Sequence, residues 1–245
     1  MALINRQTLK NYFKKGGFVT EKHFFDLIDS SLNVIDDGVS IKPDYGFKLN
    51  PIGYSSRLMS FFKKSTQKDP DFSIDLDKNN VDGLSIQSYE DETLLKFKRE
   101  GQVGVKTNDP RFDLEVKGSL GFETKVGTHI MGEVPGDRGW HTVIGNLDGV
   151  NGYEIMAHIR GLPGSGRYCI SHAIALSTFG GKMSRNKIKN TAAYYGNFLN
   201  KISFRWHGSM HNYELQARTF RHYGINPKNG EAYKIKYNII KLFSE

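Results

Sequence analysis

The sequence of 245 residues is poor in cysteine and has no long apolar run. Its single cysteine, Cys169, can form no intrachain disulfide, and its alternating apolar context predicts a small buried side chain. No apolar segment approaches the roughly 18 residues of a membrane-spanning helix, so we expect no membrane insertion. The start of the chain, MALINRQTLK, lacks the apolar stretch of a signal peptide. We therefore expect synthesis in the cytoplasm without a signal peptide, and function in an extracellular particle if the protein works outside the cell.

The sequence also lacks the patterns that usually mark catalysis or metal binding. Its histidines show neither the HxH nor the HExxH spacing, and no second cysteine is present to complete a zinc site. A glycosidase needs two facing carboxylates, and no spacing in residues 121–245 marks such a pair. The run Gly164-Ser165-Gly166 has no strand-to-helix elbow and is interpreted as a hairpin tip. We therefore predict that the protein is not an enzyme and has no catalytic residues, no metal site and no cofactor.

Positive charge is concentrated in the second half of the chain. The formal net charge at pH 7 is +8. Residues 1–120 contain 18 basic and 18 acidic side chains, whereas residues 121–245 contain 16 basic and 8 acidic ones. A basic half indicates an anionic neighbour, and nucleic acid, an acidic glycan, a lipid surface and an acidic protein face are all candidates. A merely solvated surface accounts for the same charge equally well.

Glycine and aromatic residues are plentiful, with 26 glycines and 12% aromatics. This pairing favours many short strands joined by tight turns over a helical bundle. We therefore predict a mainly β protein in three parts. Residues 1–35 form a helical docking or oligomerisation segment, residues 36–120 form an extended shaft of short strands, and residues 121–245 form a β-sandwich head.

The first part contains two predicted helices. Residues 5–14 start at the N-cap Asn5, and a second helix starts after the cap Thr20 and runs to about Leu32. Two helices of this size bury too little to stand alone, so we predict that they dock on another protein. A helical hairpin packed on the rest of this chain is the alternative. The predicted docking residues are the apolar ones at helical spacing: Leu9, Phe13, Phe24, Phe25 and Ile28.

The second part is expected to begin with loops and a short helix at residues 56–62 and to continue as alternating strands. The strands each show one thin apolar face. The last two, within residues 101–121, are predicted to form a hairpin, which is only marginally stable alone in water. Such strands cannot enclose a core in one chain, so we predict a slender intertwined trimer. Its predicted interface residues are Val103, Val105, Phe112, Leu114 and Val116.

The third part alternates more densely, with about eight predicted strands. Tyr153 to Ile159 and Tyr168 to Leu176 form a predicted hairpin, in which the apolar residues Ile170, Ile174 and Leu176 lie on the buried face. His172 shares that face and is therefore interpreted as a core histidine. We predict a β-sandwich of jelly-roll type with a core of its own.

A basic and aromatic binding surface is predicted in this third part. Residues 180–189 are read as a loop rich in lysine and arginine, and exposed aromatic rings beside such a loop would bind sugars or nucleic acid. The alternative is that the rings belong to the core and the lysines are solvated. The candidate residues are Lys182, Arg185, Lys187, Lys189, Tyr194, Tyr195 and Trp206.

The stretch NDPRFDLEVKG resembles the N-P-x-x-x-L-D-V-x-G repeat of trimeric phage tail-fibre shafts. The matching residues are Asp109-Pro110, Leu114, Val116 and Gly118, while Glu115 stands in place of the usual aspartate. In such a repeat the Leu and Val turn inward and the Gly admits a tight turn. The resemblance implies a trimeric shaft.

Two further stretches resemble proteins of phage-like particles. Residues 4–30, with Gln7-Thr8-Leu9-Lys10-Asn11, Tyr12-Phe13 and Phe24-Phe25, resemble the start of structural proteins of phages and phage-like particles from Bacteroidetes-type bacteria. The block from Pro135-Gly136-Asp137 through Trp140-His141 to residues 172–176 resembles the terminal domain of adhesin or fibre-like proteins in extracellular contractile injection systems.

These resemblances imply a homotrimeric structural component of a contractile, phage-tail-like particle. It would be a tail fibre, a baseplate cage or a cap adaptor that acts by assembly and binding. Its implied partners are copies of itself and other particle proteins such as baseplate, spike, sheath or cap, with no nucleic acid. The alternative function is a receptor-binding adhesin whose basic third part recognises an anionic cell-surface glycan.

Overall fold

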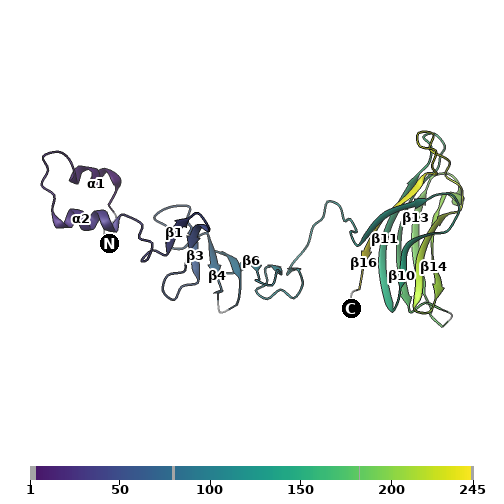
Figure 1. The fold of residues 1–245 in the computed structure, drawn as a ribbon, viewed down its shortest axis with the longest axis horizontal. Helices are drawn as coiled ribbons and strands as arrows, with labels where there is room; N and C mark the ends of the chain where they lie inside the picture. Colours follow the sequence, from purple (N-terminus) through teal and green to yellow (C-terminus); the bar gives the residue numbers. More distant parts are fainter. Residues whose placement is uncertain (1–3, 79–80, 182, 244–245) are drawn as a thin grey trace. The chain divides into compact units, whose positions relative to one another are not determined.

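The computed structural model describes residues 4–78, 81–181 and 183–243. In these residues the protein is mainly β, with several open sheets and two α-helices (Figure 1). The chain divides into two compact units, residues 1–121 and 122–245. This division lies next to the boundary expected between the shaft and the head.

The two helices are α1 (Arg6–Tyr12) and α2 (Glu21–Asp29). The predicted cap is present, because the Asn5 side chain accepts a hydrogen bond of 2.9 Å from the backbone of Thr8. Helix α2 ends before the predicted Leu32. At its end the hydroxyls of Ser30 and Ser31 bond the carbonyl oxygens of Asp26 and Leu27, a side-chain competition that favours helix termination.

The rest of the first unit is a hairpin followed by a six-stranded sheet. The hairpin pairs β1 (Val39–Lys42) with β2 (Gly46–Leu49). The sheet has its strands in chain order: β3 (Arg57–Phe61), β4 (Phe72–Leu76), β5 (Leu84–Ser88), β6 (Thr93–Phe97), β7 (Val103–Val105) and β8 (Leu114–Val116). The short helix predicted at residues 56–62 is wrong, because these residues form β3 and pair with β4.

The hairpin predicted within residues 101–121 is also wrong. Strands β7 and β8 pair in parallel, with Val103 beside Leu114 and Val105 beside Val116. The connecting loop runs back across the sheet at Gly104, where a β-carbon would lie 2.7 Å from the Thr107 carbonyl oxygen. Only glycine leaves room for this crossing, so Gly104 permits the parallel pairing.

Replacing Gly104 with alanine is therefore expected to destabilise the first unit by about 1–3 kcal/mol, the usual cost of forcing a methyl group against fixed atoms. Both tryptophans, Trp140 and Trp206, lie in the second unit. The change should thus lower an unfolding transition seen by circular dichroism and leave the tryptophan fluorescence transition in place. The control is Gly121→Ala, since a β-carbon at Gly121 meets no atom within 4 Å. Equal stability of the two variants would contradict the explanation.

The second unit contains two sheets (Figure 1). One has the order β13-β12-β11-β16-β9, and the other has the order β10-β15-β14. The elements, in chain order, are β9 (Ile130–Pro135), β10 (His141–Leu147), β11 (Val150–Arg160), β12 (Tyr168–Thr178), β13 (Lys187–Tyr194), the 3-10 helix η2 (Phe198–Asn200), β14 (Ile202–Ser209), β15 (Asn212–Thr219) and β16 (Lys234–Lys241).

Both sheets contribute to one hydrophobic core. Ile155 and Ile159 of β11 and Ile239 of β16 meet Leu215 of β15 and Ile202 of β14, and all of these are fully buried or nearly so. The prediction that Tyr153 to Ile159 alternate with buried apolar side chains is confirmed. Cys169 is buried and free, as predicted.

The buried face predicted for β12 is wrong. The side chains that point into the core are the small ones, namely Cys169, Ser171, Ala173 and Ala175. Strand β12 lies in the sheet interior between β11 and β13. The inward face of β11 already supplies large side chains, so the space left beside it fits small ones.

His172 is consequently not a core histidine. It lies on the exposed face with Ile170 and Ile174, and its Nε2 lies 3.0 Å from the Glu154 carboxylate on β11. Both faces of β12 carry apolar as well as polar side chains, so period-two alternation in the sequence does not show which face is buried.

Candidate binding surfaces

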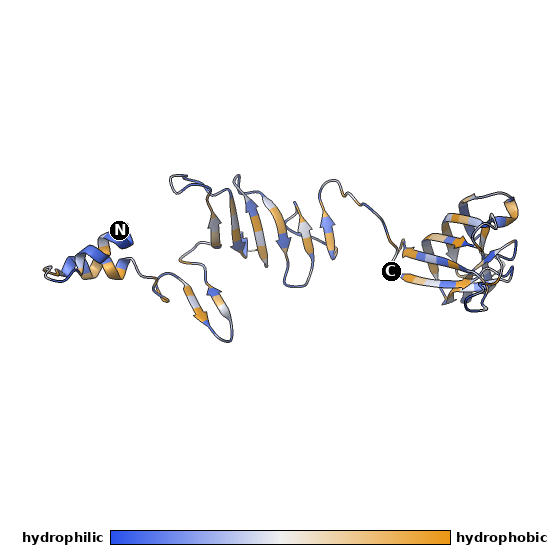
Figure 2. Ribbon diagram, turned by 90° about the horizontal axis from the view of Figure 1, so that it is seen from above, coloured by the Kyte–Doolittle hydropathy of each residue, from blue (hydrophilic) through white to orange (hydrophobic). Residues whose placement is uncertain are grey.

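One face of the six-stranded sheet is apolar on every strand. The register places Ile74 of β4 beside Ile86 of β5, and Ile86 beside Leu95 of β6. The row continues from Leu95 to Val105 and on to Val116. The alternating colours along these strands are visible in Figure 2. The members of the face are Met59, Phe61, Phe72, Ile74, Leu76, Leu84, Ile86, Leu95, Phe97, Val103, Val105, Leu114 and Val116. We call this the apolar sheet face.

The burial of this sheet is the reverse of that in an ordinary domain. The polar residues of the opposite face are buried: Ser73, Asp75, Ser85, Gln87 and Lys96. The apolar sheet face is half-buried or exposed along its whole length, and Leu114 is 56% exposed. Monomeric proteins rarely leave a continuous apolar patch of this extent open to water.

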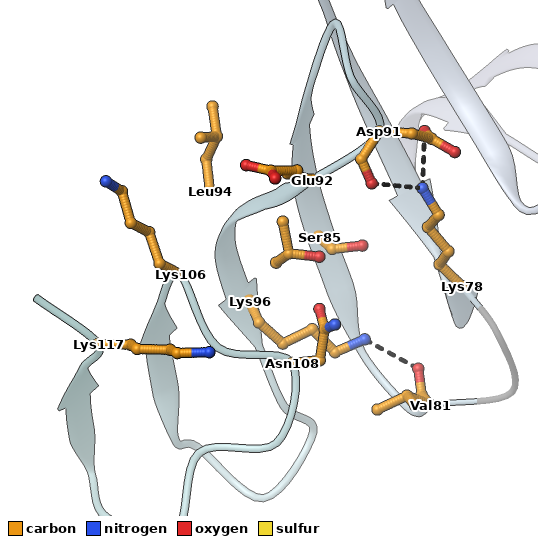
Figure 3. A pocket seen from close by; sticks show the side chains of 11 residues that line it. Lys78, Val81, Ser85, Asp91, Glu92, Leu94, Lys96, Lys106, Asn108 and Lys117 are labelled. Atoms are coloured by element: carbon orange, nitrogen blue, oxygen red, sulfur yellow. Dashed lines mark hydrogen bonds and ion pairs between the residues drawn. The ribbon is translucent and has the colours of Figure 1, made fainter.

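The opposite face is closed by its own chain. A hollow of about 440 Å³ there is lined by several lysines together with Asp91 and Glu92 (Figure 3). The ammonium of buried Lys96 donates to the Val81 carbonyl oxygen at 2.8 Å, and Lys78 pairs with Asp91 at 2.7 Å. Burial lowers the pKa of Lys96. Because the central side chains of this face are buried by their own chain and those of the apolar sheet face are not, the apolar sheet face is the side of this sheet that lacks a cover.

Four of the five predicted trimer-interface residues lie on the apolar sheet face. Val103, Val105, Leu114 and Val116 occupy neighbouring positions there. Phe112 does not share the face, because it precedes β8 in the loop, where the Arg111 guanidinium lies 5.6 Å from its ring. The structure thus brings together the strand residues and leaves the loop residue apart.

The predicted docking residues lie on the two helices. The helices contact each other through Phe13 and Phe24, whose ring centroids are 5.8 Å apart, and through the stacked rings of Tyr12 and His23. Neither helix has a buried residue among those described, and Phe24, Phe25 and Ile28 are all more than half exposed. Leu9 is partly covered. The helical pair therefore presents apolar side chains to its surroundings.

The predicted basic and aromatic surface is not a single surface. Lys182 lies outside the described residues. Lys187 and Lys189 stand at the start of strand β13 and not in a loop, whereas Tyr194 ends the same strand. Seven residues of extended strand separate Lys187 from Tyr194 by about 23 Å. The two kinds of side chain therefore cannot act on one small ligand.

Trp206 differs from the expectation, whereas Arg185 does not. The Trp206 ring packs on the core, with centroids 5.5 Å from Tyr213 and 6.5 Å from Tyr153, and its indole N–H is buried. The ring is half-buried, and it also lines a hollow of about 530 Å³ beside His207 and Met210. Arg185 lies in the loop before β13, as predicted.

Sequence reasoning missed a cluster of two arginines on one indole ring. The guanidinium groups of Arg205 and Arg218 lie 4.3 and 4.4 Å from the centroid of the Trp140 ring. Arg205 also donates to the Gln216 side chain at 2.7 Å. Cross-strand pairing of β14 with β15 brings the two arginines together, and their spacing in the sequence does not predict that pairing.

A second missed feature is a pair of adjoining hollows on the five-stranded sheet. One, of about 590 Å³, is lined by Tyr168, Tyr194 and Tyr195, and the other, of about 570 Å³, lies beside Tyr233 and Lys236. Both hollows share His158 and Arg160 as lining residues. We call the two together the tyrosine groove. The alternation of β11 gave a signal for it, since His158 and Arg160 fall between the buried residues of that strand.

The described residues contain no cluster of three or more histidine, cysteine, aspartate or glutamate side chains that could hold a metal ion. Neither of the helices that the structure describes is long and apolar enough to cross a membrane. Comparison with models of protein families and with the sequences of characterised proteins finds no match to this chain.

Proposed function

We propose that the protein is a homotrimeric structural component of a contractile, phage-tail-like injection particle and acts by assembly and binding. The observation that carries the proposal is the apolar sheet face, which runs across all six strands of one sheet without a cover. In this proposal, the apolar sheet faces of two further copies cover it. The resemblance of the stretch around Leu114 to a fibre-shaft repeat points to the same arrangement.

The dimensions of the sheet favour three copies. Because the strands follow one another in chain order, the chain advances by about 4.8 Å per strand along the hydrogen-bond direction. Strands β4, β5 and β6 have five residues each, which is about 17 Å. The centre of a triangle with sides of about 17 Å lies about 5 Å from each side, half of the roughly 10 Å spacing of packed sheets. Three such walls therefore enclose one layer of side chains from each copy.

The other parts have matching roles in the proposal. The exposed apolar residues of the helical pair dock on a neighbouring particle protein in a fibre, baseplate or cap position. The six-stranded sheets form the walls of a trimeric shaft. The second unit is a β-sandwich of jelly-roll-like character, held together by the core that its two sheets share, and it is displayed as the head.

Light scattering of the purified chain tests the proposal. The expected mass at micromolar concentration is three times the 27.8 kDa of one chain. A monomer or a dimer would contradict the trimer. The genes beside the one encoding this chain test the particle separately, because sheath, tube and baseplate genes are expected there.

A further inference from the structure

We propose that the tyrosine groove binds an acidic oligosaccharide that carries carboxylate groups. The groove lies on the outward face of the five-stranded sheet, within the second unit of one copy. Each copy of the chain therefore carries a complete groove, whether or not the chain forms a trimer. In this proposal the glycan site does not include the lysines at the start of β13.

The sheet register places aromatic and cationic side chains next to each other. Tyr168 of β12 lies directly opposite Arg160 of β11, and His158 of β11 lies opposite Lys236 of β16. Direct cross-strand neighbours have β-carbons about 4.5–5.5 Å apart. Lys236 in turn lies opposite Glu133 of the edge strand β9. Each cation therefore stands one or two positions from a ring or a polar group on the same face.

The tyrosines form an open aromatic platform. Tyr195 is 67% exposed, and its ring meets that of Tyr168 edge to face with centroids 6.4 Å apart. Tyrosine combines a large apolar ring face with a hydroxyl that stays hydrated. Such a ring matches a sugar, which has one apolar C–H face and a rim of hydroxyls. The amides of Asn226 and Asn229 line the far hollow and supply further donors and acceptors.

The groove carries unpaired positive charge. Neither Arg160 nor Lys236 takes part in an ion pair within the part of the chain that the structure describes, whereas Lys234 is held by Glu133 at 2.8 Å and Glu231 at 2.9 Å. Partial burial, together with the charges of Arg160 and Lys236, lowers the pKa of His158. A bound carboxylate would satisfy these cations, and Arg160 has the planar geometry for a bidentate contact.

The number and placement of charges favour a glycan over nucleic acid. Proteins that follow a phosphate backbone neutralise many phosphates along a continuous positive track. Here the unpaired cations Arg160 and Lys236 lie on the neighbouring strands β11 and β16, and the next strand, β9, places the carboxylate of Glu133 beside Lys236. This pattern matches isolated carboxylates on a sugar chain, with the tyrosines beside them for the sugar rings.

The test is a binding titration of the full chain with a single-stranded dT oligonucleotide and with three oligosaccharide probes. These are a hyaluronan tetrasaccharide with carboxylates, a heparin tetrasaccharide with added sulfates, and neutral chitotetraose. We expect hyaluronan to bind, and we expect Arg160→Gln to weaken it by roughly tenfold to a hundredfold, the range for losing a charged hydrogen-bond partner. Tyr195→Ala should weaken it as well. The matched control Lys187→Gln, at the other end of the sheet, should leave the affinity unchanged.

A pH series adds a second readout. Because a bound carboxylate raises the lowered pKa of His158, binding takes up a proton. The affinity should therefore increase as the pH falls from about 8 to about 6, and His158→Gln should remove that increase. The other charged or titratable groups that line the hollows around His158 include Arg160, Lys125, Lys234, Lys236, Glu133, Tyr168, Tyr194, Tyr195 and Tyr233. Pairing with Lys234 lowers the pKa of the Glu133 carboxyl, which stays charged throughout the series.

Four outcomes would overturn the glycan proposal as a whole, and a fifth would overturn its carboxylate part. They are no binding of the carboxylated probe at millimolar concentration, equal binding of neutral chitotetraose, tighter binding of a single-stranded dT oligonucleotide, and full affinity in a folded Arg160→Gln chain. A preference for the heparin probe over hyaluronan would overturn the carboxylate assignment. Since Arg160 is exposed, its substitution leaves the core intact, which circular dichroism verifies.

Discussion

Leu114→Asp is expected to convert the proposed trimer into monomers. Leu114 lies on the apolar sheet face beside Val103 and is 56% exposed in a single copy. In the proposed trimer three copies of this side chain approach the threefold axis. Three aspartates there would each lose their hydration without a partner, at a cost on the order of several kcal/mol per copy. Light scattering should show the mass fall from three chains to one.

A matched control separates this effect from general surface chemistry. Leu120 is 55% exposed, close to the value for Leu114, but it lies outside the six-stranded sheet. Leu120→Asp should therefore leave the trimer in place. If Leu114→Asp kept the mass of the unaltered chain while its circular dichroism remained unchanged, the apolar sheet face would not be the trimer interface.

Ile155→Ala is expected to cause the largest loss of stability in the second unit. Ile155 is at 0% exposure in the shared core. Replacing such a side chain with alanine removes buried methyl groups and leaves a cavity, which costs about 2–5 kcal/mol. A domain of this size loses roughly 4 °C of melting temperature per kcal/mol. Tryptophan fluorescence during heating measures the loss, because both tryptophans lie in this unit.

The control for Ile155 is an isoleucine on the neighbouring strand that faces the other way. Ile170 of β12 is 50% exposed, so Ile170→Ala should cost less than about 1 kcal/mol. The pair tests the orientation of β12 directly. Equal losses in both variants would mean that Ile170 is buried after all and that the alternation assigned to β12 is reversed.

Local patterns in the sequence determined the elements and part of one surface. The Asn5 cap depends on atoms within three residues, and the alternation of β11 depends on one strand, so both are written in the chain itself. The same holds for Val103, Val105, Leu114 and Val116, because residues two apart on a strand share a face. The uneven charge of the two halves is likewise a property of the sequence alone.

Pairing between distant segments decided the fate of residues 56–62, the buried face of β12 and the tyrosine groove. Residues 56–62 have a mixed pattern that allows a helix, and only the edge of β4 made β3 a strand. Which face of β12 is buried depends on the volume that the side chains of β11 leave free. The sequence of β12 alone carries no information about that volume. The tyrosine groove joins Arg160 of β11, Lys236 of β16 and Tyr195, which directly follows β13, and these residues are up to 76 positions apart in the chain. Such juxtapositions arise from sheet register, and register is a property of the folded chain.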